Sequence, residues 1–309
     1  MTLQNDKNKL APKQLIALLE EETSTTLVDL LPPDHFENQH IPGAKNACVF
    51  FVSFLDDLAT IVPNKKGRVV LYGSSSRSHD TKVAVEKMTR AGYQEIYQLE
   101  GGLEAWCEAG FVCEGGSDQV DEPQVSASLP NSTFAIDTNG STIEWTGRNP
   151  NSRHVGTVEI SEGVITCKEG SFSGTIEIDM NSIHNVNLEG DELQPVLEAH
   201  LKSDDFFFTS MFPQATLKIK EAVPIEHGSQ TTPNYLVKGE LSLRGVSASL
   251  DFDATVSLAD ENTLLLEAHF DIDKTRWNVI YGSSRFFEHL GMHKVFDLIS
   301  LQLNIIAAP

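Results

Sequence analysis

A short hydroxyl-rich loop, between a predicted strand and a predicted helix, holds the first residues that could do chemistry. Residues 69–92 read VVLYGSSSRSHDTKVAVEKMTRAG. The apolar run 69–71 is typical of a covered parallel strand, and we expect a helix to begin near Asp80. Backbone N–H groups ahead of a helix N-terminus can bind an anion. The candidate anion site comprises Gly73, Ser74, Ser75, Ser76, Arg77 and Ser78. The alternative, which we favour for any physiological ligand, is a turn whose polar side chains only cap the helix.

Two segments of the second half resemble metal sites in spacing but lack the required ligands. Residues 271–282 begin like a calcium loop, but Arg276 and Gly282 stand where that loop needs glycine and glutamate. His289 and His293 are four residues apart, as in a helical zinc pair, yet no third ligand is near. The four cysteines form no CxxC pair. The sequence therefore predicts no metal and no cofactor.

The charge balance limits the classes of partner. The 309-residue chain has a net charge of −21, and the part after residue 114 holds 28 of its 44 acidic residues but 12 of its 23 basic ones. Such a surface repels nucleic acid and anionic lipid headgroups, which need a basic patch. No secretory or transmembrane segment is visible. We therefore expect a cytoplasmic protein that binds no nucleic acid and does not insert stably into membranes.

The predicted helices and strands that position the candidate residues change in pattern near residue 115. Over 1–114, short apolar strands alternate with helical stretches, which predicts an α/β domain with a mostly parallel sheet flanked by helices. Residues 115–132 are rich in Gly, Ser, Pro and acid, and we interpret them as a linker. Over 133–309, period-two alternation predicts a closed antiparallel barrel or a sandwich. A helical insert at 188–203 interrupts these strands.

The first domain resembles the rhodanese family over residues 10–114. The resemblance rests on LVDLL at 27–31, HIPGA at 40–44, the segment 69–92 and QLEGGLEAW at 98–106. It implies sulfur transfer through a persulfide on a loop cysteine, whose thiolate attacks and then holds the sulfur. Gly73 stands where that cysteine belongs, and Leu30 where the family has an arginine. We therefore expect no enzyme activity, and an active sulfurtransferase is the less favoured alternative.

The second domain resembles the YceI-like family of lipocalin-like barrels over about residues 133–308. The motifs are FAIDTNGSTIEWTGR, RHVGTV, GSFSGTIEIDMNSI, HLKSDDFFFTSMFP, VKGELSLRGV and IDKTRWNVIYGSSRFFEHLG. The resemblance implies a barrel that binds a long isoprenoid lipid or a quinone. Members are often exported to the periplasm, whereas this chain shows no export signal.

Candidate ligand-binding residues are the histidine and the apolar side chains that could line the barrel or its mouth. They are Trp145, His154, Phe172, Ile176, Phe206, Phe207, Phe252, Trp277, Phe286 and Phe287. We expect the helical insert to cover an elongated apolar cavity, with gaps left by small residues such as Gly174 and Ala254. We also expect a mouth that is polar but not basic, which favours a neutral head such as a quinone or alcohol over a phosphate.

Two function classes follow. The first is a cytoplasmic binding protein for an apolar isoprenoid lipid or quinone, with an inactive rhodanese-like domain that docks a protein partner or regulates. The second is an interaction or regulatory protein whose barrel is filled with side chains. A homodimer through the barrel is expected by analogy with the family.

Overall fold

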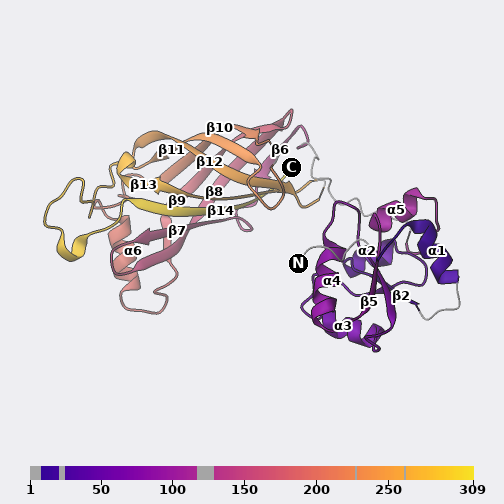
Figure 1. Ribbon diagram of the computed structural model, residues 1–309. Coiled ribbons are helices and arrows are strands. Elements are labelled where there is room, and N and C mark those ends of the chain that lie inside the picture. The colour runs from indigo at the N-terminus through magenta and orange to yellow at the C-terminus, as the bar shows by residue number, and fades with distance from the viewer. Residues whose placement is uncertain (1–7, 21–24, 117–128, 227, 261) are drawn as a thin grey trace. The chain divides into compact units, whose positions relative to one another are not determined.

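The chain divides into two compact units, residues 1–122 and 123–309, and each is described by itself. The computed structural model describes residues 8–20, 25–116, 129–226, 228–260 and 262–309. Most of the predicted linker, residues 117–128, lies outside this described part, so the domain boundaries stay a prediction. Figure 1 shows a helix-flanked sheet in the first unit and long strands in the second.

The first unit is a parallel five-stranded sheet with helices on both faces, as predicted. The strand order is β1-β5-β4-β2-β3, and every pair is parallel. The strands are β1 (Lys9–Leu10), β2 (Thr25–Asp29), β3 (Lys45–Asn46), β4 (Arg68–Tyr72) and β5 (Glu95–Leu99). The helices are α1 (Pro12–Glu20), α2 (Pro33–Asn38), α3 (Phe54–Ile61), α4 (Asp80–Arg90) and α5 (Gly102–Glu108).

Strand β4 is apolar from Val69 to Tyr72 because both of its faces are covered. Val69 and Leu71 pack in one cluster with residues of α3 and α4. Val70 and Tyr72 pack in a second cluster with residues of α1 and α5. A parallel strand buried on both faces shows a continuous apolar run for this reason. The loop after Tyr72 thus starts from the rigid centre of the unit.

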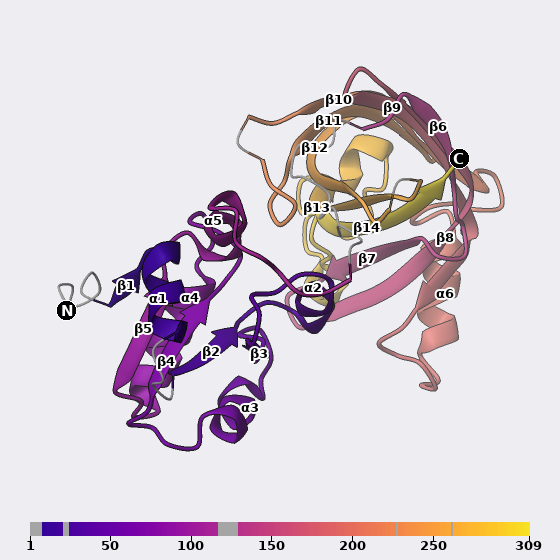
Figure 2. The same ribbon diagram turned by 90° about the vertical axis from the view of Figure 1, so that its right-hand side faces the viewer.

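The second unit is a closed antiparallel barrel, which confirms the barrel alternative over the sandwich. Its strands are β6 (Ser132–Ile136), β7 (Thr142–Arg148), β8 (Arg153–Lys168), β9 (Ser171–Asn185), β10 (Gln214–Pro224), β11 (Tyr235–Leu243), β12 (Val246–Leu258), β13 (Leu264–Asp273) and β14 (Leu298–Ala308). Neighbours pair in chain order from β8 to β14, and the β13–β14 ladder joins the last two. Both β6 and β7 lie between β8 and β14, one after the other, and complete the ring (Figure 2).

The predicted helical insert is α6 (Gln194–Lys202), which packs on β9. Two short 3-10 turns, η1 (Lys274–Trp277) and η2 (Gly291–His293), lie in the connection from β13 to β14. Figure 1 shows α6 and this connection at the same end of the barrel. None of the described helices is long and apolar enough to cross a membrane.

Candidate functional site

The barrel contains a cavity of about 290 Å³ at the end where α6 lies. Its wall is built mainly from residues of seven strands, together with α6 and the β13–β14 connection. The lining residues are Ile143, Trp145, Gly147, Arg148, Asn149, His154, Val158, Ile178, Met180, Ile183, Leu197, His200, Leu201, Phe206, Phe207, Ala215, Leu241, Leu243, Ile272, Lys274, Tyr281, Met292, His293, Lys294, Val295, Phe296, Ile299 and Leu301.

The cavity follows from strand alternation together with a few small inward residues. Side chains at every second position of a strand face the interior, as Ile143, Trp145 and Gly147 do on β7. Gly147 on β7 and Ala215 on β10 leave space that larger side chains would fill. Gly174, which the sequence suggested as a gap, instead allows close strand contact, because a Cβ there would meet the backbone of Val164 and Ile165.

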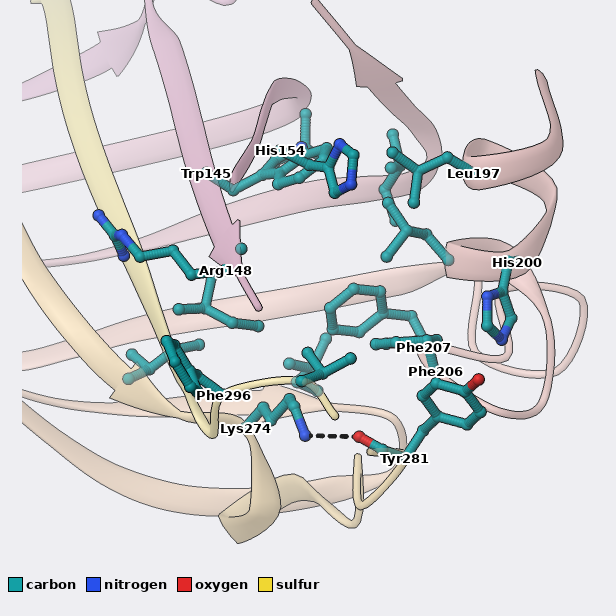
Figure 3. Close-up of a pocket in the computed structure, with 18 of the residues that line it drawn as sticks. Trp145, Arg148, His154, Leu197, His200, Phe206, Phe207, Lys274, Tyr281 and Phe296 are labelled. Atoms are coloured by element: carbon teal, nitrogen blue, oxygen red, sulfur yellow. Dashed lines mark hydrogen bonds between the residues drawn. The ribbon is translucent and has the colours of Figure 1, made fainter. Parts of the chain in front are cut away.

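One wall of the cavity carries a polar group without a partner. Nδ1 of His154, on β8, is buried and has no hydrogen-bond partner in the described structure. The neighbouring Trp145 is satisfied, because its Nε1 donates to the carbonyl of Thr157 at 3.1 Å. Figure 3 shows these two rings across the cavity from Phe206, Phe207 and Tyr281. His154 therefore lines the cavity with its ring, while protein atoms cover its unpartnered nitrogen.

The opposite wall holds a buried ammonium group. Lys274 is 1% exposed, and its Nζ donates to the carbonyls of Tyr281 at 2.9 Å and Val279 at 3.2 Å (Figure 3). Its charge lies 3.8 Å from the carboxylate of Asp297. Burial lowers the pKa of Lys274, whereas the nearby Asp297 and Asp273 act to raise it.

The remaining polar groups at the mouth mostly bond to one another. His200 of α6 lies edge-on to the rings of Phe206 and Tyr281, which also contact each other, and its Nε2 is 3.1 Å from Asp205. The hydroxyl of Tyr281 is 3.1 Å from Nδ1 of His293.

The charge of the lining differs from the expectation of a mouth that is not basic. The described lining residues include Arg148, Lys274 and Lys294 but no Asp or Glu. The guanidinium of Arg148 donates to the hydroxyl of Ser300. The expectation was wrong because the acidic residues that dominate the composition lie elsewhere on the unit. Charge alone therefore does not select a neutral head group.

The structure brings four of the ten candidate residues together at the cavity. These are Trp145, His154, Phe206 and Phe207. Four others are buried in the barrel core outside the cavity: Phe172, Ile176, Phe252 and Trp277. Phe286 and Phe287 are 53% and 44% exposed and do not line it.

Several lining residues lie outside the ten candidates. Leu197 and Leu201 of α6 line the cavity as its predicted cover, and Lys274, Tyr281 and Met292 join from the β13–β14 connection. The helical spacing of the leucines is a signal for the first two, whereas the irregular connection carries no such signal.

The loop after β4 forms a second, smaller and more polar pocket of about 200 Å³. Gly73, Ser75, Ser76 and Ser78 of the candidate anion site line it, whereas Ser74 and Arg77 do not. Arg77 pairs with Glu104 at 3.2 Å on the surface. The helix begins at Asp80, as predicted.

The carboxylate of Asp80 lies against the start of this loop. It is largely buried and accepts a hydrogen bond from the backbone N–H of Ser74 at 3.1 Å. A Cβ at Gly73 would lie 2.6 Å from the Cβ of Asp80, closer than real side chains approach. Asp80 therefore takes up one backbone donor of the loop, and residue 73 has no room for a side chain.

Comparison with known proteins identifies both units. The YceI-like domain model matches residues 134–307, and the rhodanese-like domain model matches residues 11–109. The thiosulfate sulfurtransferase GlpE of Shewanella oneidensis is 30% identical over 105 residues, which are 32% of this chain and 92% of the relative.

Two solved structures are similar to the barrel unit. BcnA of Burkholderia cenocepacia has 19% identity and a TM-score of 0.45, and the match covers 56% of this chain and 99% of BcnA. A polyisoprenoid-binding domain from Saccharophagus degradans has 14% identity and a TM-score of 0.42, over 57% of this chain and 98% of that domain.

Proposed function

We propose that this chain, which belongs to the YceI-like family and carries a rhodanese-like domain before its barrel, holds an apolar isoprenoid-type lipid or quinone in the barrel. The observation that carries the proposal is the cavity of about 290 Å³ lined mostly by apolar side chains. Its volume lies near the lower end of the range for small-molecule pockets, about 300–1,000 Å³. The cavity disfavours the alternative of a barrel filled with side chains.

Apolar burial supplies the affinity in this account. Each square ångström of apolar surface removed from water contributes about 25 cal/mol, so a tail inside the cavity binds without a charged anchor. The head group would then lie near His154, which lines the cavity. A quinone carbonyl or an alcohol oxygen would accept a hydrogen bond from the imidazole if the ring turned its covered Nδ1 toward the cavity.

We further propose that the rhodanese-like domain does not transfer sulfur and instead docks a protein partner or regulates the barrel. Sulfur transfer needs a thiolate that can carry a persulfide, and the chain has no cysteine between Cys48 and Cys107. The Asp80 carboxylate beside Gly73 also repels an anionic sulfur donor. The similarity to a thiosulfate sulfurtransferase supports a sulfurtransferase as the second candidate.

A cavity-filling substitution tests the binding proposal. Ala215 is 3% exposed and lines the cavity, so Ala215→Phe would occupy the space of the ligand. We expect the affinity for an apolar fluorescent probe, N-phenyl-1-naphthylamine, to fall at least about tenfold, the equivalent of about 1.4 kcal/mol.

The matched control is Val164→Phe, which adds the same ring at a position of β8 that is 40% exposed and outside the cavity. It should leave the affinity unchanged, and a circular-dichroism melt should show that both variants fold. Equal probe affinity in the wild type and in folded Ala215→Phe would contradict binding in this cavity.

A further inference from the structure

Exposed apolar side chains of the barrel unit concentrate at the end that contains the cavity. Among its described residues, the large apolar side chains with high exposure lie in α6 and its flanking loops, or in the β13–β14 connection and the start of β14. Val164 is the exception. Six of them are Leu193 (61%), Val196 (62%), Phe286 (53%), Phe287 (44%), Met292 (92%) and Phe296 (46%), and we call these six the apolar rim.

The apolar rim is continuous with the cavity. Met292 and Phe296 line the cavity and are also exposed. Leu193 and Val196 lie beside Leu197, whose side chain lines the cavity from α6. An apolar ligand that leaves the cavity at this end therefore passes over apolar side chains.

Polar contacts fix the segment of the rim that carries Phe286 and Phe287. The backbone N–H groups of Phe286 and Phe287 both donate to the carbonyl of Ser283, which is fully buried. Arg285, between these turns and the barrel, donates to Asp273 and Asp297, both at 2.7 Å. The structure thus keeps the two phenyl rings in water instead of letting them collapse onto the core.

We propose that the apolar rim docks the barrel on the surface of a lipid bilayer with zwitterionic headgroups, where the ligand enters and leaves. This proposal rests on the proposed function, because an apolar tail that crosses water loses the favourable free energy of burial for every methylene exposed. Contact between rim and bilayer removes that exposure. The surface contact needs no membrane-spanning element, because a few apolar side chains at the interface suffice for reversible binding.

The charges favour this occupant over the alternatives. The chain has a net charge of −21, so both an anionic bilayer and a second copy of the chain meet long-range repulsion. Locally, Arg148 and Lys294 are exposed at the cavity, whose described lining contains no carboxylate, and the exposed Glu192 and Glu288 adjoin rim residues in the sequence. This mixture of charges matches the phosphates and the cationic groups of a zwitterionic surface, whereas a second copy meets the long-range repulsion of the net charge.

Vesicle flotation with the full-length protein tests the proposal. We expect the wild type to float with phosphatidylcholine vesicles and to float less with phosphatidylglycerol vesicles at low salt. The double variant Phe286→Asp/Met292→Asp should bind phosphatidylcholine at least about tenfold more weakly, because two large side chains no longer leave water favourably. The control Val112→Asp changes a side chain that is 74% exposed in the first unit and should bind like the wild type.

Three outcomes would overturn the proposal: no flotation of the wild type, equal flotation of the double variant, or equal loss in Val112→Asp. A wild-type dimer in gel filtration that the double variant converts to a monomer would also overturn it and assign the rim to a second copy. Probe binding in solution separates this test from the proposed function. If N-phenyl-1-naphthylamine binds but the protein does not float, the docking proposal fails alone.

Discussion

At the scale of single residues, the contact between Gly73 and Asp80 decides what the first unit can do. Asp80 accepts from the backbone N–H of Ser74 and fills the space beside Gly73. The helix N-terminus and the loop therefore stabilise an internal carboxylate. A nucleophile at residue 73 would have no room beside it.

A cysteine at residue 73 should consequently fail to create an enzyme. We expect the wild type and Gly73→Cys to form no thiocyanate from thiosulfate and cyanide above the protein-free rate. Gly73→Cys should also lower the free energy of unfolding by about 1–3 kcal/mol, as overpacking does, and Asp80→Ala in the same chain should recover part of that loss. Wild-type thiocyanate formation above the protein-free rate, lost on replacement of Cys48, Cys107 or Cys113, would show that the domain transfers sulfur.

The sequence shows that the loop lacks a cysteine, but it does not show where the side chain of Asp80 lies. The identity of residue 73 can be read directly, and the strand and helix around it are predictable from the apolar run and the polar loop. Whether the loop amides face an empty site or a side chain depends on the backbone path between 74 and 80. The hydroxyl-rich composition of the loop fits both an empty anion site and a loop that binds one of its own side chains.

At the scale of elements, alternation predicts which strand residues face inward but not how far along the barrel they lie. Phe172 and Trp145 both belong to inward faces, yet Phe172 packs on Tyr235 and Trp145 lines the cavity. Depth is set by register, including the bulge between Ile219 and Ala222 in the pairing of β10 with β9. A single sequence does not show the register, so it does not separate the cavity wall from the solid core.

The β13–β14 connection carries no periodic pattern, and ion pairs around the buried Lys274 hold it in place. Lys274, Asp297, Arg285 and Asp273 form a network of ion pairs within 3.8 Å that ties the connection to both strands. Hydrogen bonds from Thr275 and Arg285 lower the pKa of Asp273 although burial acts to raise it. The sequence shows these residues only as scattered charges.

Replacing the buried member of this network should destabilise the barrel unit. Lys274→Met leaves Asp297 without its buried partner and frees two carbonyls, so the free energy of unfolding should fall by about 3 kcal/mol in urea titrations. The matched change Lys294→Met removes an exposed lysine and should cost less than about 0.5 kcal/mol. Equal costs for the two variants would show that the network does not hold the connection.

At the scale of the whole molecule, the two units have separate hydrophobic cores. The barrel core forms one cluster, and the clusters on the two faces of the parallel sheet contain only residues of the first unit. The change from alternating helices and strands to period-two strands made this division predictable from the sequence. Each core is large enough to support a domain of its size.

Fragments 1–114 and 133–309 should therefore each unfold cooperatively when expressed alone. Differential scanning calorimetry should give one transition for each fragment, at a temperature close to that of the same unit in the full chain. A fragment that has no cooperative transition would mean that the domain boundary is misplaced.

The central claim is that the barrel carries an apolar molecule, and the direct measurement is mass spectrometry of an organic extract of the purified full-length protein. The account predicts an isoprenoid-type lipid or a quinone in the extract of the wild type, and its loss from Ala215→Phe purified in the same way. Extracts of the wild type that contain no apolar molecule above the level in Ala215→Phe, from protein that also fails to bind N-phenyl-1-naphthylamine, would contradict it.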